Sequence, residues 1–292
     1  MSGMAPRGWQ FFRDRPMDGA VVLFTMILFG FVNHGSYQSG WATFLGVLAG
    51  LAAALAGSDT ARFRALVVAC LMIALMVWVN YYRSANHGFM ILWIGLALLL
   101  AAACPPGGQE PALRRNAAIL LGLLMGIALI QKLRSPYYMQ GNLLGGLLLE
   151  GEIYRNLLTL ILPDWPMKLV EYRVAAHNLM VSPDPAVTGV AVPALVLWLA
   201  RWMTVGSLVA QGVIEVALLF RRRLGWLFHA LLLGFVAVVY STRDENVFLS
   251  MNCLLGYCLT EDRSRGFRPV YALAVLYLLL AGAMGLRPWI IS

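Results

Sequence analysis

The sequence predicts an all-α fold, a polytopic helical membrane protein of about nine transmembrane helices. Apolar residues make up 60% of the 292 residues, charged residues only 12%, and the mean hydropathy is +0.74. Apolar runs near the length of a membrane helix recur along the chain, with short charged loops between them. Because no Pro/Gly/Ser-rich linker divides the halves, we expect residues 1–292 to form a single integral membrane domain.

The predicted spans are apolar runs bounded by charged or turn-forming residues. They cover residues 19–33, 41–57, 65–82, 88–104, 116–131, 203–220, 224–240, 246–259 and 270–286. The polar segment before the first run is too long for the start of a signal peptide, and no small-residue cleavage site follows Phe31. We therefore expect the first run to be a retained helix.

The distribution of cations predicts the orientation. Of 22 cationic residues, 13 fall in segments that would lie on the same side of the membrane as the N-terminus. The short segments on the opposite side carry only Arg83, Arg243 and Arg287. Cations of short loops stay in the cytoplasm, so we expect a bacterial cytoplasmic-membrane protein with its N-terminus inside and its C-terminus outside. The 13 residues are Arg7, Arg13, Arg15, Arg62, Arg64, Arg114, Arg115, Arg221, Arg222, Arg223, Arg263, Arg265 and Arg268.

A long outer-face segment, residues 132–202, separates the fifth and sixth spans, and loops of this length are uncommon unless they are functional. Residues 142–162 mix leucines with charges and predict an amphipathic helix, and Trp165, Trp198 and Trp202 suit the membrane interface. Residues 187–199 contain Pro193 and are too short to cross, so we expect a re-entrant stretch.

Several classes of function are disfavoured. The net charge of +8 is spread over short loops rather than one face, so no nucleic-acid partner is expected. The four cysteines lie in or beside apolar runs, and Cys253 and Cys258 do not share a helix face, so we expect buried thiols and no metal site. The absence of an internal repeat weighs against a transporter built from inverted repeats.

Lys132 is the first candidate functional residue. Only two of the 22 cationic residues are lysines, and this one ends the fifth apolar run. A lysine amine can lose its proton when it is desolvated, whereas a guanidinium stays charged, so lysine suits a base. The alternative is a snorkelling cation that anchors the helix end.

Two histidines share the predicted level of Lys132. His34 closes the first span and His87 opens the fourth, with Asn86 beside it as an amide that could orient a ligand. We expect the amine and the imidazoles to hold a polar ring such as a quinol, with Lys132 as base. The alternative is that these histidines and Asn86 cap helix ends.

Glu215 is the only acidic residue well inside a predicted span, where charge is costly enough to indicate function. It lies six residues before Arg221, and His229 lies six residues after Arg223, so each stands about 9 Å from the arginine turn on antiparallel helices. We expect the two side chains to face each other. They would form either a hydrogen-bonded pair that locks the hairpin or a proton relay.

Three short elements carry a family resemblance. Residues 86–90 read Asn-His-Gly-Phe-Met at the start of a span, residues 131–133 read Gln-Lys-Leu, and residues 137–141 read Tyr-Tyr-Met-Gln-Gly. Glu215 is then followed by a basic break, Gly-x-x-Phe and His229. Over most of residues 65–260 the chain resembles the membrane domain of vitamin K-dependent gamma-carboxylase and its bacterial relatives, the HTTM family.

The chain departs from this family in three ways. Residues 134–136 (Arg-Ser-Pro) replace a short polar step, with about one extra residue before Gly141, and His229 is displaced by about one helical turn. The carboxylases also continue into a large lumenal domain that recognises the protein substrate, and residues 1–292 contain no such domain. Carboxylation of a protein therefore lies outside what the resemblance implies.

The resemblance implies that Lys132 is the base towards a reduced quinone, vitamin K-like or menaquinol, and that His87 assists it. Asn86, His34 and Tyr138 are then candidate substrate-binding residues. The activity would be that of a quinol-dependent, carboxylase-like or oxygenase-like lyase. The alternative is a non-catalytic membrane partner for the maturation, export or immunity of a secreted peptide.

The predicted orientation can be tested by thiol labelling in a chain whose four native cysteines are replaced. An impermeant reagent outside intact cells should modify a cysteine introduced by Arg243→Cys, because this position is expected outside. The matched variant Arg222→Cys should react only after permeabilisation. Labelling of position 222 from outside would contradict the orientation.

Overall fold

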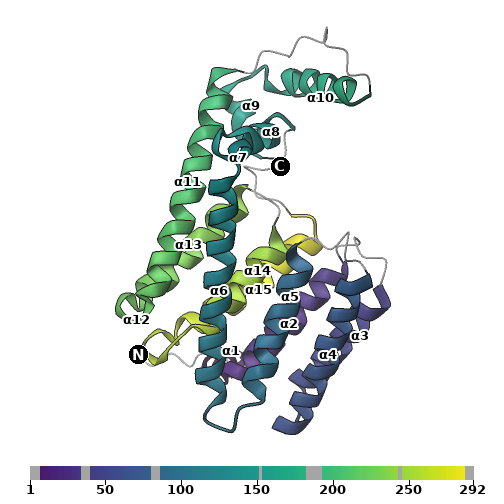
Figure 1. The fold of residues 1–292 in the computed structure, drawn as a ribbon, viewed down its shortest axis with the longest axis vertical. Coiled ribbons are helices and arrows are strands. Elements are labelled where there is room, and N and C mark those ends of the chain that lie inside the picture. The colour runs from purple at the N-terminus through teal and green to yellow at the C-terminus, as the bar shows by residue number, and fades with distance from the viewer. Residues whose placement is uncertain are drawn as a thin grey trace. The chain divides into compact units, whose positions relative to one another are not determined.

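The computed structural model describes residues 7–33, 40–79, 86–150, 153–181, 193–242 and 245–286. Every regular element in these ranges is helical (Figure 1), which confirms the predicted all-α class. Three helices are long and apolar enough to cross a membrane, as expected of an integral membrane protein. They are α4 (Asp59–Val79), α6 (Gln109–Arg134) and α11 (Ala194–Leu219).

The other six predicted runs also form helices, but these are shorter than a typical span. They are α2 (Pro16–Asn33), α3 (Gly40–Ala54), α5 (Asn86–Ala102), α13 (Trp226–Thr242), α14 (Asn246–Cys258) and α15 (Phe267–Ala283). The remaining helices are α1 (Arg7–Asp14), α7 (Pro136–Met139), α8 (Asn142–Glu150), α9 (Arg155–Ile161), α10 (Trp165–Val181) and α12 (Arg221–Leu224), with a 3₁₀ turn at Asp262–Ser264.

Two predicted boundaries in the outer-face segment are wrong. Residues 194–202 are not separate from the sixth span, because α11 runs without a break from Ala194. Pro193 directly precedes the helix, and the exposed Arg201 and Trp202 do not interrupt its backbone hydrogen bonds. Residues 142–162 form two helices, α8 and α9, because the chain takes a left-handed conformation at Tyr154 (φ 53°) that no helix can contain.

The chain packs as two compact units. Unit 1 comprises residues 1–123, 217–236 and 245–286, and unit 2 comprises residues 124–216, 237–244 and 287–292. The boundaries fall inside α6, α11 and α13, so each of these helices contributes residues to both units.

The centre of unit 1 is α14, in which every residue except Phe248 is buried. It packs against α15 and α2, while α3 and α5 pack against α2 and α4. Its apolar residues lie on every side of the helix, which favours a position inside a bundle, although Asn246, Ser250 and Asn252 are buried with them. Among the cysteines, Cys70, Cys253 and Cys258 are buried free thiols as predicted, whereas Cys104 is half-buried.

Unit 2 has a hydrophobic core of its own, formed by α8, α9, α10 and the first turns of α11. The indole of Trp165 is fully buried there, against the ring of Tyr172. The predicted interfacial position of Trp165 is therefore wrong, because the tryptophan closes the core. Trp198 and Trp202 are exposed on α11 with their rings in edge-to-face contact, which suits the membrane interface.

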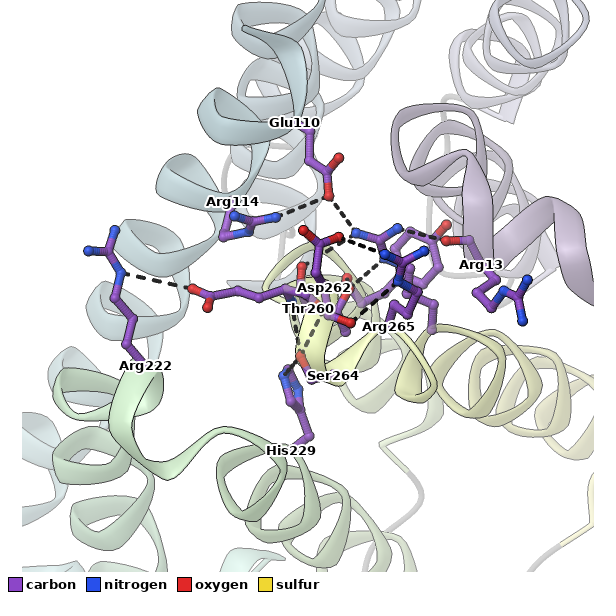
Figure 2. Close-up of polar contacts among 12 residues, drawn as sticks. Arg13, Glu110, Arg114, Arg222, His229, Thr260, Asp262, Ser264 and Arg265 are labelled. Carbon is purple, nitrogen blue, oxygen red and sulfur yellow. Dashed lines mark hydrogen bonds and ion pairs between the residues drawn. The ribbon is translucent and has the colours of Figure 1, made fainter. Parts of the chain in front are cut away.

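A buried arginine, Arg268, connects several helices of unit 1, and Figure 2 labels its partners Arg13, Glu110 and Thr260. Arg268 is 4% exposed and donates from Nε to Thr260 Oγ1 (2.7 Å) and from Nη1 to the carbonyl oxygen of Arg13 (2.7 Å). Its Nη2 forms an ion pair with Glu110. The guanidinium therefore joins α15 to the last turn of α1, to the start of α6 and to the turn after α14.

Neighbouring contacts complete this cluster. Glu110 also accepts from Arg114 at 3.0 Å, one turn along α6. The hydroxyl of Tyr257 donates to the carbonyl oxygen of Phe12 at 2.8 Å. The last carbonyls of a helix have no partner within the helix. Arg268 and the Tyr257 hydroxyl therefore satisfy the end of α1, where they donate to Arg13 and Phe12.

Arg268→Lys should lower the thermal unfolding midpoint of the detergent-solubilised protein. A lysine cannot reproduce the planar fork that reaches three partners, and disrupting a buried charged network costs about 3 kcal/mol. Arg265→Lys is the matched control, because among the described residues Arg265 forms an ion pair with the exposed Asp262 alone, and such a pair contributes about 0–1 kcal/mol. Equal midpoints for the two variants would contradict the role of Arg268.

Candidate functional site

Lys132 lies in the last turn of α6 and is half-buried. Its Nζ stands 5.1 Å from the centroid of the Tyr138 ring. At this distance an ammonium group is attracted by the negative face of the ring. The structure therefore brings together two of the residues singled out by the sequence.

Local structure fixes the Tyr138 side chain. Ser135 caps α7 by accepting from the backbone N–H of Tyr138 at 3.2 Å, and Pro136 takes the first helical position, where its missing N–H has no consequence. The Tyr138 side chain is buried, and its hydroxyl forms a hydrogen bond with Ser207 of α11.

The hydrogen bonds around Ser207 determine which hydroxyl group acts as the donor in each bond. Ser207 Oγ lies 2.9 Å from the carbonyl oxygen of Thr204, to which it donates. The hydroxyl of Tyr138 must then donate to Ser207, because Ser207 has only one proton to give. Thr204 in turn donates to the carbonyl oxygen of Ala200 at 2.9 Å.

Gly141 allows the chain after α7 to press against α11. Its φ is +80°, and an ideal Cβ at this position would lie 3.3 Å from backbone atoms of Ala200 and Arg201. Any other residue would be strained there and would meet backbone that cannot move aside. The end of α6, α7 and α11 are thus held as one arrangement around Lys132 and Tyr138.

The chemistry of this arrangement suits proton uptake. Lys132 supplies an amine, and a proton gained at Nζ is stabilised over the Tyr138 ring. The Tyr138 hydroxyl donates a hydrogen bond to Ser207, and this bond fixes the orientation of the phenol ring. The cluster thus holds the Lys132 amine at a defined point beside an aromatic face.

The other predicted members of this site are only partly described. Asn86 and His87 are the first two residues of α5, but their side chains lie outside the described part of the structure. His34 lies wholly outside the described residues. Their placement beside Lys132 remains a prediction.

His229, on α13, is buried in unit 1 with both ring nitrogens in hydrogen bonds. Nδ1 lies 3.1 Å from the hydroxyl of Tyr271, and Nε2 lies 3.1 Å from Ser264 Oγ (Figure 2 draws the second contact). Ser264 also accepts from the backbone N–H of Glu261 and can donate to its carbonyl oxygen. A neutral imidazole with its proton on Nε2 satisfies all these groups, since Tyr271 then donates to Nδ1.

These contacts occupy both ring nitrogens that the predicted pair with Glu215 would use, and the facing of the two side chains remains a prediction. Both nitrogens of His229 are engaged by Ser264 and Tyr271, and its ring stacks on Phe267 at 5.3 Å between centroids. Equal depth on consecutive helices fixes only the axial level of two side chains, not the direction in which each points. We therefore regard His229 as a structural residue of unit 1.

Glu215 lies in unit 2, half-buried on α11 against the backbone of Gly126 on α6. An ideal Cβ on Gly126 would lie 3.1 Å from Glu215 Oε1, so the glycine makes room for the carboxyl group. Oε1 is buried and has no hydrogen-bond partner among the described residues.

The polar face of α11 to which Glu215 belongs was not predicted from the sequence. Thr204, Ser207, Gln211 and Glu215 follow each other at intervals of three, four and four residues, which places them on one side of α11. We call these four residues the α11 polar stripe. Helical periodicity, applied to the polar residues of the span, could have identified it.

No group of three or more His, Cys, Asp or Glu side chains within the described ranges could hold a metal ion. Comparisons of the sequence with protein families and with curated proteins, and of the fold with solved structures, found no match.

Tyr138→Phe should destabilise the protein by about 1 kcal/mol, because it removes one hydrogen bond to Ser207 but keeps the ring. Tyr138→Leu should cost more, because it also removes the aromatic face beneath Lys132. Tyr137→Phe is the matched control, since Tyr137 is exposed on the same helix. The thermal unfolding midpoint in detergent is measured for all three variants. If Tyr137→Phe had the lowest midpoint of the three, the result would contradict this account.

Proposed function

We propose that this protein is a carboxylase-like membrane enzyme that handles a reduced quinone at the outer face of the bacterial cytoplasmic membrane, with Lys132 as base and His87 assisting. One observation carries the proposal. The Lys132 amine stands over the buried ring of Tyr138, whose hydroxyl is held by Ser207. The resemblance of residues 86–90, 131–133 and 137–141 to the carboxylase membrane domain supports the same assignment.

The residues at this site fit a reduced quinone in their chemistry. A hydroquinone is a flat, largely apolar ring with acidic hydroxyls, so it needs an apolar or aromatic surface and a proton acceptor. Tyr138 offers the aromatic face and Lys132 the acceptor. The exposed Ile130, Leu133 and Tyr137 add apolar surface around them. When bound, the quinol would supply reducing equivalents.

The chain's own contribution to the chemistry would be proton transfer. Lys132 would accept a proton at Nζ, and the Tyr138 ring would stabilise the ammonium group that forms. Tyr138 would hold its position through Ser207 and so keep the amine at one point. This arrangement suits a general base, which must lie within reach of the proton that it removes.

The second class of function is a non-catalytic membrane partner for a secreted peptide. In that case Lys132 would only anchor α6, and any long cation would serve. The two functions therefore differ in whether position 132 needs an amine or merely a positive charge.

Lys132→Arg should abolish the enzyme's function while leaving the protein folded, because arginine keeps the charge but cannot accept a proton near neutral pH. The assay is a cellular phenotype that depends on this gene, with the amount of protein in the membrane measured alongside.

Lys168→Arg is the matched control for this test. Lys168 is the only other lysine and lies in α10, so its replacement should leave the phenotype intact. Full function of the Lys132→Arg variant would contradict a base at this position and would favour the partner function.

A further inference from the structure

The C-terminal half of the α11 polar stripe, Gln211 and Glu215, contains two buried hydrogen-bond acceptors that lack a donor among the described residues. Gln211 is 5% exposed, and its Oε1 has no hydrogen-bond partner among the described residues. Glu215 Oε1, one helical turn away on the same face, is also buried and without a partner. Both residues lie in unit 2, in a helix with the length and hydropathy of a membrane span.

The other half of the stripe is satisfied. Thr204 donates to Ala200, Ser207 donates to Thr204, and Tyr138 bonds to Ser207. The missing donors are therefore a property of Gln211 and Glu215 and not of the whole face. A buried acceptor that lacks a donor is destabilising, so the pair requires a donor.

No charged neighbour supplies that donor. The contact of Glu215 with another helix is to Gly126 of α6, which has no side chain and can reach the carboxyl group only through its backbone. On α11 itself, the residues three or four positions from Glu215 are Gln211, Gly212, Leu218 and Leu219, none of them charged. Within the described ranges no cation forms an ion pair with Glu215, so its charge is not compensated in this way.

We infer that Glu215 and Gln211 form a proton-binding site within the membrane-spanning part of α11. A proton from water adds to the Glu215 carboxylate, and the resulting carboxyl group donates its hydrogen to Gln211 Oε1 one turn away. This single proton removes the charge that a bilayer penalises and supplies the donor that Gln211 lacks. On release, the same proton returns to water.

A proton suits this site better than a metal ion does. Ca²⁺ and Mg²⁺ take about six or more oxygen ligands, whereas Glu215 and Gln211 together carry only three side-chain oxygens. Gly126 leaves space for the carboxyl group itself, because an ideal Cβ would already lie 3.1 Å from Oε1. A proton needs only one carboxyl group and one acceptor.

The test is chemical modification with an apolar carbodiimide, applied to the full chain in detergent at a series of pH values. The reagent requires a protonated carboxyl group: the acid proton moves to a carbodiimide nitrogen, the carboxylate oxygen bonds to the central carbon, and rearrangement leaves a stable acylurea. Peptide mass spectrometry locates the product. Glu215 should be modified at neutral pH, and the modification should decline as the pH rises.

Two variants and one control residue make this test specific. Glu215→Gln should abolish the modification of this peptide. Gln211→Leu should lower the pH midpoint by about one unit, a tenfold loss of proton affinity, because the acceptor that stabilises the acid form is gone. The exposed Asp262, which pairs with Arg265, should remain unmodified in every sample.

Three results would overturn the inference. They are no modification of Glu215 at any pH, an unchanged midpoint in folded Gln211→Leu, and protection of Glu215 by Na⁺ but not by choline at constant pH. The last result would make the site a sodium site. The readout needs no catalytic activity and no quinol, so it is independent of whether Lys132 proves to be a base.

Discussion

Polar side chains within apolar helices must find their hydrogen-bonding partners inside the protein, because a bilayer offers none. Arg268 meets this constraint most fully. Its guanidinium is buried in unit 1, yet its donors reach a hydroxyl on Thr260, the carbonyl oxygen of Arg13 and the carboxylate of Glu110. Segments far apart in the sequence are fixed by this one group, since moving any of them would strand a buried charge.

The same constraint shapes the smaller polar sites. His229 is satisfied by a hydroxyl on each side, so it contributes to the packing of α13 against α15 and the turn before it. Tyr138 is satisfied by Ser207, which frees its ring to face the amine of Lys132. A reactive group can be held at a fixed point only where the groups behind it are already paired.

The sequence predicted the helices well and the partners poorly. All nine apolar runs form helices because hydrophobic length is a local property. The predicted start of α11 was too late, because Arg201 and Trp202 indicated a boundary. A helix tolerates such residues on its exposed side. Lys132 could be identified from composition alone, and Tyr138 lies only six residues further on. The partners of His229 lie 35 and 42 residues away, so no local pattern could indicate them.

The chain thus contains two solutions to the cost of a charge among apolar helices. Glu110 is compensated by ion pairs, because Arg268 and Arg114 surround the carboxylate with donors. Glu215 has no such cation among the described residues and instead lies one turn from a second acceptor, Gln211. An ion pair fixes structure permanently, whereas a carboxyl group that can gain and lose a proton responds to its surroundings. For this reason we assign a structural role to the cluster around Arg268 and look for the protein's chemistry along α11.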